Sequence, residues 1–176
     1  MMKALRTTGH KSAQVMDTPI PTLHPDYILI RTAAVALNPT DWKHVEWVSS
    51  TTTMGVDFAG TISEIGANVK RPWKKGDRVF GLTHGSNTGK PETGAFGEFV
   101  VAKGDVVLKC PEWMGFEEAA TMPVGVMTNV MGLWKELGLP LPGSEEAKAA
   151  WEGKKQILIY GGSTATGMHA IQIAKL

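Results

Sequence analysis

Residues 156–176, with the sequence QILIYGGSTATGMHAIQIAKL, decide how the rest of the chain is interpreted. They open with the apolar run 157–160, which predicts a short strand buried on both faces. Two glycines, a hydroxyl-rich run and Gly167 follow, and apolar residues then return at helical spacing. A strand, a glycine turn and a helix start form a site where backbone N–H groups and the positive helix end can hold a phosphate. Gly162 and Gly167 do not fit the spacing G-x-G-x-x-G, so a nucleotide turn and an ordinary strand-to-helix connection both remain open.

The composition excludes several classes of function. A chain of 176 residues with a net charge of +1 has room for one domain, or for one domain and part of another. Its basic residues are scattered, which argues against a nucleic-acid partner. No apolar run approaches the roughly 18 residues of a membrane span, and the N-terminus lacks an apolar signal core, so we expect a cytoplasmic protein. Cys110 is the single cysteine, which excludes an intrachain disulfide and a cysteine-rich zinc site.

Short β patterns separated by glycine turns fill about the first 110 residues and indicate a compact, partly open β-barrel. Asn38 or Thr40 is expected to cap a short helix, and Gly60 to mark a bulge or a close backbone approach. Helices are predicted before and after Pro123, and Ser144 is expected to cap a small charged helix. The predicted strands cover residues 3–7, 13–17, 27–37, 56–65, 78–81, 96–102 and 106–108, and the predicted helices cover residues 116–122, 124–137 and 144–151.

Six motifs occur in a fixed order: ALNPTDWKH, GVDFAGTISEIG, KKGDRVFG, GAFGEFVVA, EEAATMPVGVMT and ILIYGGSTATGMHAIQIAK. As an ordered set they resemble the medium-chain dehydrogenase/reductase superfamily, and within it the zinc-free, quinone oxidoreductase-like branch. The chain is most similar to fungal trans-acting enoyl reductases of polyketide synthesis, whose nucleotide turn reads GGSTAT. The resemblance covers essentially the whole chain.

The resemblance implies a mostly β GroES-like barrel followed by the first βα unit of a Rossmann α/β domain. We expect the GroES-like catalytic domain at residues 1–122 and the start of the NAD(P)-binding Rossmann domain at residues 123–176, with the cofactor lying between them. The family's Rossmann domain has about six parallel strands. We therefore expect a truncated product, a fragment or an incomplete gene model.

Zinc is not expected. Zinc-dependent relatives place a cysteine where Asn38 stands and a His–Glu pair where Val56 and Asp57 stand. Zinc prefers imidazole and thiolate ligands, and the five histidines show no ligand-like spacing. We predict no metal.

The resemblance also implies which residues carry the chemistry. Lys43 and Thr128 are the expected catalytic residues, because an ammonium and a hydroxyl can stabilise a developing enolate. The expected cofactor-binding residues are Thr40, Asp41, Trp42, Lys43, Ser163, Thr164, Ala165 and Thr166. The expected substrate-binding residues are Thr128, Asn129, Val130, Met131, Gly132, Leu133, Trp134 and Lys135.

The residues alone leave simpler roles open. Lys43 could merely face solvent on a short helix, and the apolar residues after Thr128 could pack in a core. Turn and capping roles explain Asp41, Asp57 and Asp77 as well as acid–base roles do.

Two functions from different classes follow. The first is NADPH-dependent reduction of an activated carbon–carbon double bond in an enoyl thioester, enone or quinone, by hydride transfer without zinc. The resemblance alone implies NADPH and a small or carrier-bound acyl substrate, with a polyketide synthase as partner. The second is a non-catalytic remnant, a folded GroES-like domain that binds no cofactor.

Overall fold

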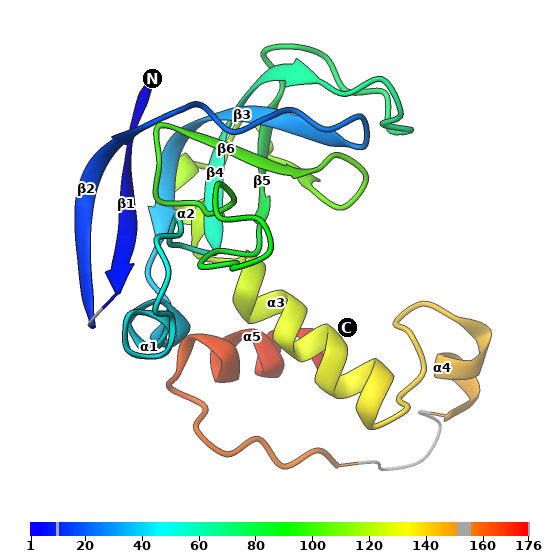
Figure 1. The fold of residues 1–176 in the computed structure, drawn as a ribbon. Helices are drawn as coiled ribbons and strands as arrows, with labels where there is room; N and C mark the ends of the chain where they lie inside the picture. The colour runs from blue at the N-terminus through cyan, green and yellow to red at the C-terminus, as the bar shows by residue number, and fades with distance from the viewer. Residues whose placement is uncertain (10, 151–155, 176) are drawn as a thin grey trace. The chain divides into compact units, whose positions relative to one another are not determined.

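The computed structural model describes residues 1–9, 11–150 and 156–175, and the chain forms two compact units, Met1–Pro123 and Val124–Leu176. The first unit is mostly β, as the sequence predicts (Figure 1). Its elements are β1 (Met2–Gly9), β2 (Ser12–Thr18), β3 (Tyr27–Ala36), α1 (Pro39–Trp47), β4 (Asp57–Ile65), β5 (Arg78–Leu82), β6 (Phe99–Lys103), β7 (Leu108–Lys109) and α2 (Phe116–Ala120).

All strand pairs of the first unit are antiparallel. β1 and β2 form a hairpin, and the remaining strands form one sheet in the order β6-β3-β4-β5-β7. Single bridges from Ala4 to Gly97 and from Arg6 to Thr53 connect β1 to segments outside the hairpin. These bridges give the unit the barrel-like closure that the alternation of its sequence favours.

Both faces of the five-stranded sheet contribute side chains to the core. Successive strand residues point to opposite faces, so Phe58 and Val79 enter one apolar cluster while their neighbours Ala59 and Phe80 enter another. The second cluster contains Ala119 and Ala120 of α2 (and Cys110), so this helix covers one face of the sheet. β4 is buried from Asp57 to Gly60 and again at Ile62, because both of its faces pack against protein there.

Gly60 is a close backbone approach, as predicted. A Cβ atom at this position would lie 2.1 Å from the carbonyl oxygen of Arg31 on β3. The β3–β4 register shifts between Leu29 and Ile30 and again between Thr32 and Ala34. The missing side chain therefore lets the two strands meet where the ladder is irregular.

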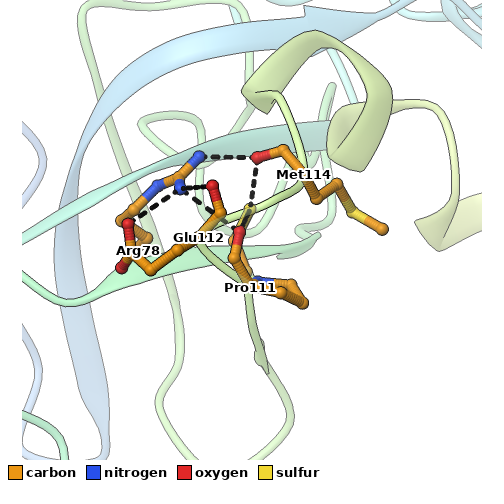
Figure 2. Close-up of polar contacts among 5 residues, drawn as sticks. Arg78, Pro111, Glu112 and Met114 are labelled. Atoms are coloured by element: carbon orange, nitrogen blue, oxygen red, sulfur yellow. Dashed lines mark hydrogen bonds and ion pairs between the residues drawn. The ribbon is translucent and has the colours of Figure 1, made fainter.

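Arg78 fixes the segment that leaves the barrel (Figure 2). Its guanidinium donates to the carbonyl oxygens of Pro111, Glu112 and Met114 at 3.2, 3.1 and 2.7 Å. It also lies 4.4 Å from the ring centroid of Phe116, the first residue of α2. A planar group with several donors suits this role, because it satisfies three carbonyls of one segment from one position.

The second unit is built from helices: α3 (Pro123–Val130), the π-helical segment η1 (Met131–Glu136), α4 (Glu145–Ala150) and α5 (Ala165–Ile173). Its first helix begins at the proline that was expected to separate two helices. Ser144 caps α4 as predicted, since its hydroxyl accepts the backbone N–H of Ala147 at 3.0 Å. Across the described residues, no helix is long and apolar enough to cross a membrane.

The strand predicted at residues 157–160 is wrong. These residues belong to no strand, and Leu158 and Tyr160 are 95% and 101% exposed rather than buried. A strand forms only where a neighbour completes its backbone hydrogen bonds. Every regular element in the described part of the second unit is a helix, so this apolar run has no strand to pair with there.

Candidate functional site

Residues Thr40 to Lys43 lie in the first turn of α1. The helix begins as its sequence predicts: Asn38 is the N-cap with extended backbone, and Pro39 occupies the first helical position. A carboxylate oxygen of Asp41 accepts the backbone N–H of Asn38 at 2.7 Å. Asp41 thus has the capping role that the sequence left open beside an acid–base role.

The predicted cofactor residues of α1 differ in exposure. Asp41 is buried, Thr40 and Lys43 are half-buried, and Trp42 is 57% exposed. The Lys43 ammonium lies 5.7 Å from the ring centroid of Trp42. Burial raises the pKa of the Asp41 carboxyl above its usual range, and the Asn38 N–H and the nearby His44 oppose that shift. A cation and an aromatic face are therefore the groups that this helix offers to a ligand.

The positions that hold zinc ligands in zinc-dependent relatives carry a hydrogen bond here. The Asn38 side-chain amide donates to the Asp57 carboxylate at 2.9 Å, and Asp57 is only 1% exposed. In the part of the chain that the structure describes, no group of three or more His, Cys, Asp or Glu side chains could hold a metal ion. The sequence did not predict this contact, although β3 and β4 pair Ala36 with Asp57 and so bring Asn38 close.

The glycine turn before α5 is held by its own hydrogen bonds. The Thr164 hydroxyl donates to the carbonyl oxygen of Gly161 at 2.8 Å and accepts the N–H of Gly167 at 3.0 Å. Gly161 has a φ of +85°, which favours glycine. A Cβ atom on Gly167 would lie 2.2 Å from the Gly161 carbonyl oxygen. Both glycines are therefore required by the shape of the turn.

The turn offers donors to an anion. The N–H groups of Ala165 and Thr166 have no acceptor among residues 1–9, 11–150 and 156–175, as is usual for the first residues of a helix. Ser163 is exposed, whereas the Thr164 hydroxyl already donates to the turn itself. Backbone N–H groups, the Ser163 hydroxyl and the positive end of α5 are therefore what this turn can present to a phosphate.

Asn129, predicted to bind substrate, connects α3 to the glycine turn. It is 7% exposed, and its side-chain amide donates to the carbonyl oxygens of Gly125 and Thr166, both at 2.9 Å. Gly125 itself lies against α5, because a Cβ atom there would meet the His169 ring at 2.4 Å. No pattern in the sequence pointed to this contact beyond a glycine inside a predicted helix.

The other residues predicted to bind substrate differ in their exposure. Leu133 is buried, and the Trp134 indole N–H donates to the carbonyl oxygen of Pro140 at 3.1 Å. Val130 and Gly132 are half-buried. Thr128, Met131 and Lys135 are exposed.

One groove of ≈ 430 Å³ in the second unit brings together part of the predicted cofactor set and part of the predicted substrate set, and its lining does not include Thr128. It is lined by Asn129, Gly132 and Leu133 of α3 and η1, and by Thr164, Thr166 and Gly167 of the turn. A neighbouring apolar cavity of ≈ 450 Å³ is lined by Leu133, Trp134, Leu139, Pro140, Pro142, Gly143, Ala147, Ile157, Ile173, Ala174 and Lys175. The glycine turn and part of the predicted acyl surface therefore line one groove.

The family model for the alcohol dehydrogenase GroES-like domain matches residues 24–112. Among curated proteins, the chain is 48% identical to the trans-enoyl reductase TOXD of Cochliobolus carbonum, over 99% of this chain and 58% of that protein. It is 43% identical to the trans-enoyl reductase resD of Aspergillus sclerotiorum, over 100% of this chain and 51% of that protein.

Solved structures give the same assignment of fold. The quinone oxidoreductase of Coxiella burnetii superposes with a TM-score of 0.75 at 26% identity, over 99% of this chain and 53% of that one. The CurK enoyl reductase superposes with a TM-score of 0.71 at 25% identity, over 99% of this chain and 51% of that one. The chain thus spans about half the length of the relatives that it matches, and the predicted fold class is confirmed.

Proposed function

Because the chain belongs to the family of alcohol dehydrogenase GroES-like domains, we propose that it is part of an enzyme that reduces activated carbon–carbon double bonds with NADPH. The acceptor would be an enoyl thioester, an enone or a quinone. The observation that carries this proposal is the similarity to two trans-enoyl reductases over 99–100% of the chain. The proposal includes the domain identities expected from the sequence, a catalytic barrel at residues 1–122 and the start of a cofactor domain at residues 123–176.

The glycine turn fits a dinucleotide phosphate. Its outward N–H groups at Ala165 and Thr166 and the exposed Ser163 can donate to phosphate oxygens without a charged residue. Gly167 lets the start of α5 lie close to Gly161, which keeps the turn narrow. NADPH, when bound, supplies the hydride for the β-carbon of the acceptor.

The protein's own residues would stabilise the charge that develops on the acceptor. We assign to Lys43 the neutralisation of the developing enolate oxygen, and to Thr128 a hydrogen bond to the acceptor carbonyl. The α-carbon would take its proton from solvent. The proposal uses no metal, and Asn38 and Asp57 are bonded to each other where zinc-dependent relatives hold the ion.

The test is NADPH oxidation by the protein at the full length of its relatives, with one acceptor from each of the three classes. Lys43→Gln should lower kcat/KM for the preferred acceptor by about 100-fold or more, the usual loss when a group that stabilises an oxyanion is removed. Lys75→Gln, the same change on an exposed turn residue, should leave it unchanged. Absence of NADPH oxidation with all three acceptor classes would refute the proposal.

A polyketide synthase is the proposed partner, with the acyl chain delivered on its carrier protein. The two relatives are named trans-enoyl reductases, and an enzyme that acts in trans needs its substrate brought by another protein. The expected cytoplasmic location belongs to the same proposal.

A specific observation favours a second function for the 176-residue chain by itself, that of a folded domain without cofactor binding. Residues 157–160 make no strand, and Leu158 and Tyr160 are exposed, so the element before the glycine turn lacks its sheet. Fluorescence titration of this chain with NADPH distinguishes the two functions. Tight binding of NADPH would refute the non-catalytic function. Absence of binding up to about 1 mM NADPH would support it, because a Kd of that size corresponds to a binding free energy of only about 4 kcal/mol.

A further inference from the structure

Helix α1, which carries Lys43, has little apolar contact to hold it. Val45 packs against the barrel core, whereas Trp42 and Trp47 are 57% and 69% exposed. A helix of nine residues is marginal without tertiary contacts. Its position on the barrel must therefore depend largely on other interactions at its ends.

Asn38, at the start of this helix, is held from two sides. Its side-chain amide donates to an oxygen of Asp57 at 2.9 Å, and its backbone N–H donates to an oxygen of Asp41 at 2.7 Å. Asp57 is the first residue of β4 and pairs with Ala36 in the sheet. The two carboxylates are 1% and 4% exposed and Asn38 is half-buried, so both bonds are partly shielded from water.

We propose that Asn38 is a positioning residue: by bridging Asp57 of the sheet and Asp41 of α1, it fixes the helix that presents Lys43. This inference rests on the proposed function, in which Lys43 acts on the acceptor. Asn38 and Asp57 touch no reacting atom in that proposal, and they act only through the placement of α1. We call the three residues the Asp57–Asn38–Asp41 bridge.

The bridge requires a donor between two carboxylates, and this requirement suggests a specific variant. Asn38→Asp keeps a good N-cap residue, since asparagine and aspartate cap helices equally well. However, it replaces the donated hydrogen bond by two carboxylates about 3 Å apart in a buried site, which is unfavourable. Loosening of α1 in Asn38→Asp that the further change Asp57→Asn reverses therefore reports the contact with Asp57, rather than the cap or the nearby Asp41 carboxylate.

Hydrogen–deuterium exchange on the 176-residue chain measures the bridge without reference to activity. In Asn38→Asp, amides of α1 should exchange about tenfold faster or more, while amides of β3 and β4 keep their wild-type rates. The double variant Asn38→Asp/Asp57→Asn exchanges donor and acceptor and should restore wild-type rates in α1. Asn68→Asp, the same change on an exposed turn residue, is the matched control.

Two results would overturn the inference. One is wild-type exchange of α1 in Asn38→Asp, and the other is equally fast exchange in Asn38→Asp and in the double variant. A uniform increase over α1, β3 and β4 that the second change does not reverse would also overturn it, because it would show a general loss of stability.

The effect of the bridge on catalysis is measured as kcat in a protein of the same length as the relatives. Asn38→Asp should lower kcat about tenfold or more, and the double variant should recover most of that loss. If the wild-type protein reduces none of the three acceptor classes, the proposed function fails while exchange in α1 still decides the bridge. If the wild type is active and Asn38→Asp matches it in kcat, the positioning role fails and the proposed function stands.

Discussion

Gly167→Ala is expected to destabilise the second unit, although alanine is the better helix former. The new Cβ atom would lie 2.2 Å from the carbonyl oxygen of Gly161 and 3.0 Å from the Cα atom of Gly162. Neither contact is a flexible side-chain end, so the turn itself has to open. Because favourable contacts between heavy atoms lie at about 3.5–4 Å, the opening must be on the order of 1 Å.

The magnitude follows from three contributions. Overpacking of this kind costs about 1–3 kcal/mol. Opening the turn also weakens the hydrogen bond from the Gly167 N–H to the Thr164 hydroxyl, which contributes about 1 kcal/mol. Alanine in place of glycine within a helix returns up to about 1 kcal/mol. The net loss in the free energy of unfolding is about 1–3 kcal/mol, opposite in sign to the effect of helix propensity alone.

Urea-induced unfolding of wild type, Gly167→Ala and Gly132→Ala measures this loss. Gly132 lies in η1 of the same unit, and a Cβ atom there would meet nothing within 4 Å, so its substitution should be neutral or stabilising by up to about 1 kcal/mol. In the protein at the length of its relatives, Gly167→Ala should also weaken NADPH binding about tenfold, which corresponds to about 1.4 kcal/mol. A Gly167→Ala variant as stable as Gly132→Ala would refute the reasoning.

Three further predictions concern buried polar groups. Arg78→Lys should lower the free energy of unfolding by about 1–3 kcal/mol in urea, because an ammonium cannot replace the guanidinium's bonds to three carbonyls; an unchanged midpoint would contradict the anchoring role. Asn129→Leu should lower the free energy of unfolding by about 1–3 kcal/mol, since it removes the side-chain amide that donates to the carbonyls of Gly125 and Thr166; wild-type stability in urea would show that water replaces the amide. Asp41 has a raised pKa in the folded state, so its contribution to stability is present at acid pH and is lost as pH rises through that raised value. Asp41→Asn does not titrate, so its stability relative to wild type should increase from about pH 4 upward and then level off; a difference that is independent of pH would contradict the burial of this carboxyl.

The barrel could be predicted from the sequence because its signals are local. The alternation of side chains along residues 27–37 predicts a strand, residues 56–65 predict another, and the structure places β3 and β4 there. Gly60 gave the position of a close approach because glycine is needed where two backbones meet. The predicted ends of the strands were less accurate. β6 begins at Phe99 rather than at residue 96, because the residues before Phe99 form backbone hydrogen bonds with β1 instead.

The polar bonds inside the candidate site could not be predicted in the same way. Asn129 looked like one more residue of a helix that lines an acyl channel, but its amide is used to join that helix to Thr166. Asn38 and Asp57 are separated by 19 positions. Their contact depends on the register of two strands, which a single sequence specifies only through the pattern of its buried face.

The glycine turn and the apolar run before it show the difference between local and distant determinants. The turn is closed by contacts within seven residues: Thr164 with Gly161, Thr164 with Gly167, and the close approach of Gly167 to Gly161. It therefore keeps its shape while residues 157–160 pair with no strand. Those residues have the composition of a buried strand. A strand also needs a neighbouring strand, however, because each of its inter-strand hydrogen bonds requires a partner group on another segment. The glycine turn is thus encoded in its own sequence, whereas the strand predicted before it requires a neighbouring strand to pair with.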